Sequence, residues 1–309
     1  GDVYKRQTFD KGKPRNRNIA EALARSGAEL SEIHADIWQG VEDKSQLGWA
    51  ARLVRYTRWS LAYPALIFRF LVSEKPDVVF VGYPGQIDVL LLWPFARLRR
   101  VPVALDLFIS LYDTAVTDRG MIRPRSLKAW LIWLLERLSL RAADKVFLDT
   151  ASHARHIESL YNLREGTFGA FPVSVEKQFF PTHPAPEVSD RPKLLFYGQL
   201  IPLHGIATVM EAALSDAGRK FDWTIIGSGQ DTPVVEAALQ DQASSHIIWH
   251  RWVDYAKLST LIDEADLCLG IFGTSEKAAS VIPNKVYQCL ASGRHVVTRR
   301  SPEMEEIHS

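Results

Sequence analysis

Cysteine is scarce in this sequence, and long apolar runs are missing. Its two cysteines, Cys268 and Cys289, lie inside apolar segments without the spacing of a paired ligand set, which excludes a disulfide scaffold or a cysteine zinc site and suits a reducing compartment. The longest apolar runs, 87–96 and 129–135, are far shorter than the roughly 18 residues that span a bilayer. The rest of the composition is that of an ordinary globular protein, which excludes collagen, coiled coil and disorder.

Net charge is also low, at a formal +1 over the whole chain, but its two parts differ. Residues 1–185 hold 26 Lys and Arg against 20 Asp and Glu, whereas residues 186–309 hold 11 against 16. This asymmetry predicts two domains with different partners. The basic first part suits an anionic lipid surface or another polyanion.

Both ends of the sequence read as truncated. There is no initiator methionine, and residues 1–7 fit neither a strand nor a helix pattern, so we interpret them as a cloning or assembly scar. Residues 301–309 stop where a charged helix begins. We therefore expect a first domain without its first strand and a second domain whose last helix is cut short.

Between these ends, strand-like apolar runs alternate with segments of helical period. The helix over 16–26 is ended by Gly27, and the helix over 204–217 is ended by Gly218. Repeated β-α units of this kind predict parallel sheets with helices on both faces. The predicted strands are 28–36, 77–82, 101–107, 144–149, 166–171, 193–198, 221–227, 245–250, 265–272 and 294–299.

Residues 172–192 break this rhythm with five prolines and no periodicity, as in an interdomain linker. We predict an α/β protein with a Rossmann-like domain over 1–172, a linker over 173–192 and a second Rossmann-like domain over 193–309. The carboxyl ends of both sheets would line a cleft between the domains, and ligands bind at that edge in open α/β sheets.

Four strands of the second half end in small or polar residues. A single glycine after a strand is more often structural, because tight βα turns need it, but four such loops in order favour a ligand site. The loops contain Gly198, Gln199 and His204; Gly227, Ser228 and Gly229; Trp252; and, in the fourth, Ser275, Glu276 and the segment 281–293.

The fourth loop leads into a helix that Pro283 starts and Gly293 ends. Backbone N–H groups at this start, together with Asn284 and Lys285, favour a diphosphate. Gln288, about one turn further, would point toward a ribose. The alternative is that Pro283 only begins a helix and Lys285 is a solvated side chain; the pattern favours neither interpretation.

These motifs resemble the nucleotide-sugar-binding half of a GT-B glycosyltransferase of the family-4, "group 1" type. The resemblance rests on G-x-L…G at 198–205, IIGSG at 225–229, a W-V-D turn and IPNKVYQCLASGRHVVT at 282–298. It extends well over 190–307 and more loosely over 14–172. It implies two Rossmann-like domains in GT-B arrangement that transfer a sugar from a nucleotide sugar to a hydroxyl acceptor, with retention of configuration and without metal or other cofactor.

The resemblance also implies an acceptor class and a cellular location, and it leaves an alternative function open. We expect a saccharide or lipid-linked acceptor, a role in cell-surface polysaccharide or glycolipid synthesis, and a cytoplasmic protein on the inner face of the membrane. The alternative function is a non-catalytic GT-B-like binding or scaffold subunit. A sugar-nucleotide epimerase fits less well, because it needs acid/base groups that the sequence lacks around the sugar.

This chain departs from the family at four polar positions. A basic pair that usually meets the diphosphate reads Gln199 and His204, and two glutamates eight positions apart read Ser280 and Gln288. Lys285, within P-N-K, would supply the missing positive charge. The donor-binding residues implied are Gly198, Gln199, Gly227, Ser228, Gly229, Trp252, Ser275, Glu276, Pro283, Asn284, Lys285 and Gln288.

The first half would bind the acceptor. Asp106 and Asp113 lie at and after the end of the strand over 101–107 and, with His204, are the catalytic candidates; one carboxylate would position or deprotonate the acceptor hydroxyl. The alternative is that both carboxylates only cap loops. His153 and His156 read as surface polar residues, and no metal ligand is predicted. Arg15, Asn16 and Arg17, in the first loop, would face acceptor or phosphate.

Two segments of the first half, 47–73 and 125–141, combine basic residues with tryptophan on predicted helices. Basic amphipathic helices with interfacial tryptophan lie in lipid headgroup regions, so an anionic membrane surface is a candidate partner. The alternative is that both helices pack on the core with basic outer faces. No nucleic-acid motif accompanies them, so nucleic acid is not expected as a partner.

Overall fold

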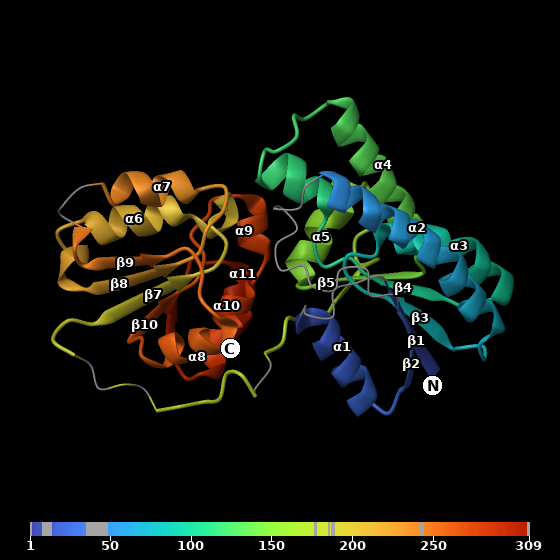
Figure 1. The fold of residues 1–309 in the computed structure, drawn as a ribbon, viewed down its shortest axis with the longest axis horizontal. Coiled ribbons are helices and arrows are strands. Elements are labelled where there is room, and N and C mark those ends of the chain that lie inside the picture. The colour runs from blue at the N-terminus through green and yellow to red at the C-terminus, as the bar shows by residue number, and fades with distance from the viewer. Residues whose placement is uncertain are drawn as a thin grey trace. The chain divides into compact units, whose positions relative to one another are not determined.

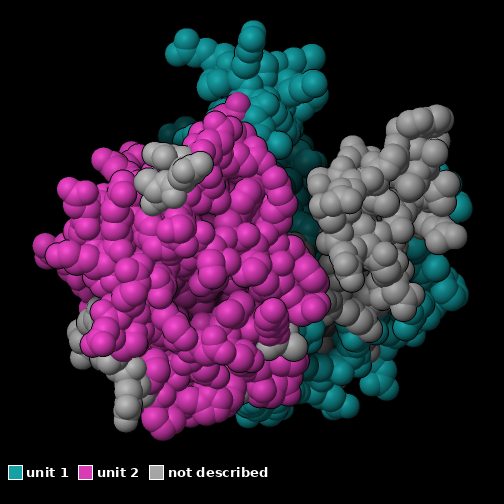
Figure 2. Space-filling model, turned by 60° about the vertical axis from the view of Figure 1, so that its left-hand side comes forward, with its two compact units in different colours: residues 1–117, 121–171 teal, residues 118–120, 172–309 magenta. Residues whose placement is uncertain are grey.

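A computed structural model of the chain describes residues 2–7, 14–34, 49–175, 178–184, 186, 189–240 and 244–307. The chain forms two compact units, residues 1–117 with 121–171, and residues 118–120 with 172–309 (Figure 2). Each unit is built on one parallel sheet with helices on both faces (Figure 1). The predicted α/β class with two Rossmann-like domains is confirmed. No described helix has the length and apolarity needed to cross a membrane.

The first unit contains six parallel strands in the order β2-β1-β3-β4-β5-β6. They are β1 (Asp2–Gln7), β2 (Glu29–His34), β3 (Val78–Val81), β4 (Val103–Asp106), β5 (Lys145–Leu148) and β6 (Gly169–Ala170). The helices are α1 (Pro14–Arg25), α2 (Trp49–Val72), α3 (Gln86–Arg99), a π-helical segment (Asp113–Asp118), α4 (Leu127–Ala142) and α5 (Ala151–Leu160).

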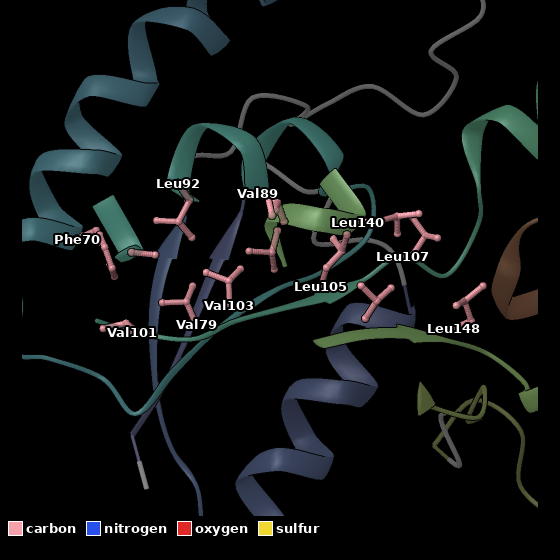
Figure 3. Packing of buried hydrophobic residues seen from close by; sticks show 14 of the residues in the cluster. Phe70, Val79, Val89, Leu92, Val101, Val103, Leu105, Leu107, Leu140 and Leu148 are labelled. Carbon is pink, nitrogen blue, oxygen red and sulfur yellow. The ribbon is translucent and has the colours of Figure 1, made fainter. Parts of the chain in front are cut away.

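The main core of this unit lies between the sheet and α2, α3, α4 and α5, whereas α1 covers the opposite face (Figure 1). Phe70, Leu92 and Leu140, each from a different helix, pack with Val79 and Leu105 of the sheet (Figure 3). Burying each such side chain contributes about 1.5–3 kcal/mol. The near-continuous apolar runs of β3, β4 and β5 follow from burial on both faces.

The second unit contains five parallel strands in the order β11-β10-β7-β8-β9. They are β7 (Lys193–Tyr197), β8 (Asp222–Ile226), β9 (Ile247–His250), β10 (Leu267–Leu269) and β11 (His295–Val297). The helices are α6 (Ile206–Leu214), α7 (Thr232–Ala238), α8 (Tyr255–Asp263), α9 (Glu276–Ser280), α10 (Asn284–Ala291) and α11 (Pro302–Ile307), with single 3₁₀ turns at Pro202–His204 and Gly218–Lys220. α6 and α7 pack on one face of the sheet, and α8 and α10 on the other.

All ten strands predicted from apolar runs are present, each within its predicted range. The segment 1–7 corrects the sequence analysis, because its residues 2–7 form β1, paired in parallel with both β2 and β3. The prediction that no strand lies there was wrong. A central parallel strand normally reads as an apolar run, which DVYKRQ does not, so only the pairing on both sides reveals it.

The described part of the predicted linker belongs with the second unit. Phe180 is buried in the core beside α8, and the Thr182 hydroxyl donates to the Ala291 carbonyl at 2.7 Å. Arg294 donates to the Pro184 carbonyl at 2.9 Å. Residues 180–184 are therefore fixed to the end of α10 rather than standing apart from the fold.

Candidate active site

The loops after β7 and β8 lie against each other at the carboxyl edge of the second sheet. The N–H of Leu200 donates to the Ser228 carbonyl at 3.1 Å, and the N–H of Gly198 donates to Ile226 at 2.9 Å. Gly227 has a φ of 142°, and a Cβ there would lie 1.9 Å from the Gly198 carbonyl oxygen. A side chain at Gly227 is therefore excluded, and the two backbones approach closely where a ligand of an α/β sheet binds.

His204 closes the loop after β7. Its Nδ1 hydrogen bonds to the Gln199 carbonyl, and since a carbonyl only accepts, Nδ1 carries the proton. Burial, and then the nearby charge of Lys285, lower the pKa of His204 to about 3. His204 is therefore neutral near pH 7, with the lone pair on Nε2.

Lys285, in the first turn of α10, reaches the same place. A Cβ built on Gly198 would lie 2.9 Å from His204 Cε1 and 3.5 Å from Lys285 Cε, so the three residues are neighbours. Lys285 is only 4% exposed, and in the described chain its Nζ has no hydrogen-bond partner. The ammonium lies 3.9 Å from the centre of the Phe196 ring. Burial lowers the pKa of Lys285 to about 7.

The start of α10 has no side-chain cap, because Pro283 occupies the N-cap position. The helix ends just before Gly293, as predicted, and Gly293 adopts a left-handed φ of 75°. Gln288, predicted to face a ribose, is held by two tyrosines: Tyr197 donates to its Oε1 at 3.0 Å, and its Nε2 donates to Tyr255 at 3.1 Å. The amide of Gln288 is thus already oriented within the protein.

The other donor-side candidates are placed at the same sheet edge, in loops that follow their strands. Trp252, after β9, is 69% exposed. Ser275 caps α9 by accepting from the Ala278 N–H at 3.1 Å, and Glu276 is the first residue of that helix. The side chains of Gln199, Ser228 and Asn284 are exposed. Their ligand roles remain predictions.

In the first unit, the structure joins two predicted residues to each other. Arg15 holds Asp106 in a bidentate pair, with Nε 2.7 Å from Oδ2 and Nη2 2.6 Å from Oδ1. Arg15 also donates to the Phe171 carbonyl at 3.0 Å, and its guanidinium lies 4.3 Å from the Phe108 ring centre. Burial raises the pKa of Asp106, which the hydrogen bond and charge of Arg15 oppose. This pair ties α1 to the ends of β4 and β6.

The remaining acceptor-side candidates lie nearby in sequence but have separate partners. Asp113 is fully buried, with Oδ1 3.2 Å from His156 Nε2. The Asn16 amide donates to the Tyr83 carbonyl at 2.9 Å, and Arg17 is half-buried. The first part of the predicted acceptor loop, residues 8–13, lies outside the described residues.

Glu136 is the most heavily bonded side chain that sequence reasoning missed. Its fully buried carboxylate accepts from the backbone N–H groups of Leu111 (2.8 Å) and Tyr112 (3.1 Å) and from the hydroxyls of Ser110 (2.7 Å) and Tyr161 (2.7 Å). Burial, and then the charge of Glu136, raise the pKa of Tyr161. Glu136 thereby fixes the loop that leads from β4 to Asp113. A lone acid in the apolar run LKAWLIWLLERL was the available signal.

Sequence reasoning also missed an aspartate–histidine pair in the segment after β5. Asp149 Oδ1 lies 2.6 Å from His153 Nδ1, and both residues are buried. The prediction that His153 is a surface polar residue was therefore wrong. The signal in the sequence was the spacing of four, which places an aspartate before a helix within reach of a histidine in its first turn.

Two protein-family models match the chain. A "Glycosyl transferase 4-like domain" matches residues 13–167, and "Glycosyl transferases group 1" matches residues 191–309. A search of curated proteins found no match.

Solved structures of similar fold cover nearly all of the chain. Sucrose-phosphate synthase from Thermosynechococcus elongatus has a TM-score of 0.69 at 13% identity, covering 99% of this chain and 82% of its own. The catalytic domain of starch synthase IV from Arabidopsis thaliana, bound to ADP and acarbose, gives 0.66 at 12%, covering 99% and 84%. Anabaena HepE in complex with UDP-glucose gives 0.61 at 10%, covering 99% and 82%. At such identities the likeness concerns the fold. Because family models match both units, this chain belongs to the family-4, group 1 glycosyltransferases of GT-B fold.

Proposed function

We propose that this glycosyltransferase takes its sugar from a nucleotide-sugar donor and transfers it to a hydroxyl of a saccharide or lipid-linked acceptor, with retention of configuration. The observation that carries the proposal is the buried Lys285 ammonium, which has no hydrogen-bond partner in the described chain and lies beside Gly198. Two proteins of similar fold support the donor class, since HepE is in complex with UDP-glucose and starch synthase IV is bound to ADP.

The proposed rate acceleration comes from stabilising the leaving nucleoside diphosphate. Negative charge develops on the bridging oxygen as the bond to the sugar breaks, and fixed donors aimed at that charge lower the barrier. Lys285 and the uncapped start of α10 would supply this stabilisation. The role of a cation toward the diphosphate is assigned to these groups, so the proposed reaction includes no metal ion.

The neutral His204 has a different role in this proposal. With its proton held on Nδ1 by the Gln199 carbonyl, it presents the Nε2 lone pair and accepts a hydrogen bond from a sugar hydroxyl. On the acceptor side, Asp113 and Asp106 remain the candidates for positioning the hydroxyl. Retention rests on the resemblance to the family.

A second candidate function is a non-catalytic binding or scaffold subunit. It is favoured by the replacement of two glutamates by Ser280 and Gln288, since Ser280 donates to the Glu276 carbonyl at 2.7 Å and two tyrosines hold Gln288. Neither side chain offers a carboxylate to the sugar.

Calorimetry with a panel of nucleoside diphosphates and an activity screen with nucleotide sugars separate these functions. Lys285→Ala should weaken diphosphate binding by about 10- to 150-fold, because a charge-assisted contact contributes about 1.5–3 kcal/mol. Nucleoside binding should hardly change. Lys257→Ala, an exposed lysine of α8, is the matched control. Equal diphosphate binding by Lys285→Ala and wild type contradicts the site, and binding without transfer or donor hydrolysis supports the scaffold.

We further propose that the protein works at the inner face of a membrane, in cell-surface polysaccharide or glycolipid synthesis. The support is the outer face of α2, α3 and α4, called here the outer helix face, where large apolar side chains are exposed. They are Leu61, Phe68, Leu71, Val72, Ile87, Leu91, Trp93, Leu98, Leu127, Trp130, Leu131 and Leu138.

The spacing of these residues is regular. On α3 the exposed positions 87, 91 and 98 repeat at four and seven residues, as do 127, 131 and 138 on α4, so each set lies along one side of its helix. The other sides of α3 and α4 face the core, so both helices are apolar on two sides. An apolar helix surface that is exposed to solvent normally binds a partner.

Charge favours an anionic partner. The three helices contain two acidic residues, Asp88 and Glu136, and both are buried. Exposed basic residues on the same helices include Arg69, Lys128 and Arg141. The side chains of 49–56 and 58–60, part of the predicted membrane segment, lie outside the described residues.

Flotation with vesicles of phosphatidylcholine and phosphatidylglycerol tests this surface. We expect the full chain to float at low salt and to be released at high salt, where the Debye length falls to a few ångströms. Replacing Leu98 and Leu131 together by Ser, one residue from each of these two sets, should weaken binding to the vesicles at least about tenfold. Ile248→Ser, an exposed apolar residue of β9, is the control. Failure to float at low salt would leave the outer helix face without this partner.

A further inference from the structure

The surroundings of the Lys285 ammonium contain no carboxylate among the groups that the structure shows around it. β7 contributes Phe196 and Tyr197, whose hydroxyl donates to the Lys285 carbonyl at 3.2 Å. The 3₁₀ turn contributes His204, and α10 itself contributes Cys289. The ammonium thus lies against an aromatic ring, in a buried place, with no carboxylate beside it.

A lone ammonium in such a place is costly in its charged form. Burial lowers the pKa of Lys285 from 10.5 to about 7, and the charge interaction with the Cys289 sulfur opposes this shift. His204 adds no charge near neutrality, since its pKa is lowered to about 3. Above pH 7 the protein therefore leaves most of Lys285 without its proton.

We propose that Lys285 gains a proton when this site binds a nucleoside diphosphate, so that proton uptake is part of donor recognition. The inference rests on the proposed function and adds to it. A nucleoside diphosphate brings the opposite charge that the lysine lacks, and its negative charge favours the protonated amine. A nucleoside carries no such charge and leaves the lysine as it is.

The size of the uptake follows from the titration. At pH 8 a group with a pKa of about 7 is about one-tenth protonated, so recharging it takes up about 0.9 proton per site. At pH 6 the lysine is already about nine-tenths protonated, so its own share of the uptake falls to about 0.1. A terminal phosphate titrates near pH 6, so at pH 8 the ligand itself is fully ionised and contributes nothing.

The test is calorimetry of UDP and ADP binding to the full chain at pH 8, in two buffers of different ionisation enthalpy. The difference in observed enthalpy, divided by the difference in buffer enthalpy, gives the protons taken up. We expect about 0.9 for whichever diphosphate binds and none for uridine or adenosine.

Two variants identify the group. Lys285→Arg stays charged at every pH used and should bind the diphosphate with an uptake near zero. Cys289→Ser keeps the lysine and should keep the uptake. Circular dichroism checks that both variants fold.

The outcomes separate the inference from the proposed function. Diphosphate binding with no uptake in wild type overturns the inference and leaves the donor site standing. Undiminished uptake in Lys285→Arg, or loss of uptake in Cys289→Ser, also overturns it, because another group then carries the proton. Absence of binding by every nucleoside diphosphate overturns the proposed function itself.

Discussion

Two buried charges, one in each unit, have opposite surroundings. The carboxylate of Glu136 accepts hydrogen bonds from two backbone N–H groups, two hydroxyls and the Gln86 amide, and is fully satisfied by the first unit. The ammonium of Lys285, almost as deeply buried, has an aromatic face and no hydrogen bond in the described chain. A satisfied buried charge holds a loop in place, whereas an unsatisfied one reduces stability, which agrees with the ligand role proposed for Lys285. Removing the two charges should therefore change stability in opposite directions.

The largest effect is expected from a buried pair of opposite charges in the first unit, Arg15 and Asp106. Arg15→Met leaves the Asp106 carboxylate buried and unpaired, which should lower the free energy of unfolding by about 3–5 kcal/mol. The double variant Arg15→Met/Asp106→Leu removes both charges and should recover most of the loss. Urea unfolding followed by circular dichroism measures both. A double variant as unstable as the single one would mean that the pair does more than neutralise charge.

Lys285→Met should act in the other direction and stabilise the protein by about 2–4 kcal/mol at pH 7. The pKa of Lys285 falls on folding from 10.5 to about 7, so the unfolded chain binds the proton more tightly. The cost of the lysine is therefore complete below about pH 7 and disappears as the pH rises toward 10.5. Urea unfolding at pH 6, 8 and 10 tests the trend. The exposed Lys257→Met should show none, and an advantage of Lys285→Met that grows with pH would contradict the assignment.

The smallest expected effect is that of Glu136→Gln, which keeps the shape and removes the charge. Hydrogen bonds to a charged group contribute about 1.5–3 kcal/mol, so a loss of that order is expected, together with a faster hydrogen exchange of the Leu111 and Tyr112 amides. Glu165→Gln, an exposed acid of the same unit, serves as the control. Unchanged amide protection would show that the loop is held by its backbone alone.

The sequence indicated which candidate residues would be neighbours better in the second unit than in the first. Gly198, His204 and Lys285 lie far apart along the chain, but each follows a strand or begins a helix, and parallel strands bring such residues to one edge. Lys285 was predicted beside a ligand without any sign of its deep burial. Periodicity records which side of an element is apolar, and it does not record how far a long side chain turns inward.

The first site was harder to predict because its polar residues pair with each other. Arg15 and Asp106 were separate candidates for binding or catalysis, and their mutual ion pair spans 91 positions. Glu136 was not among the candidates, and His153 was interpreted as a surface residue, since the sequence around a polar residue does not show which groups will bond to it. Hydrogen-bond satisfaction is a property of the folded neighbourhood.

By itself the sequence determined the ten apolar strands, their alternation with helices, the parallel class of both sheets and the family. These properties depend on local periodicity and on motifs within one loop, and both can be read from residues that are close together in the sequence. Tertiary structure decided the rest. It formed the strand at 2–7 and paired Arg15 with Asp106. It also gave the Glu136 carboxylate five hydrogen-bond donors, Gln86 among them, and left the Lys285 ammonium without any hydrogen-bond partner in the described chain. Each of these features depends on which groups the fold brings next to each other. For a buried charge, the neighbouring group decides whether burial stabilises or destabilises the protein.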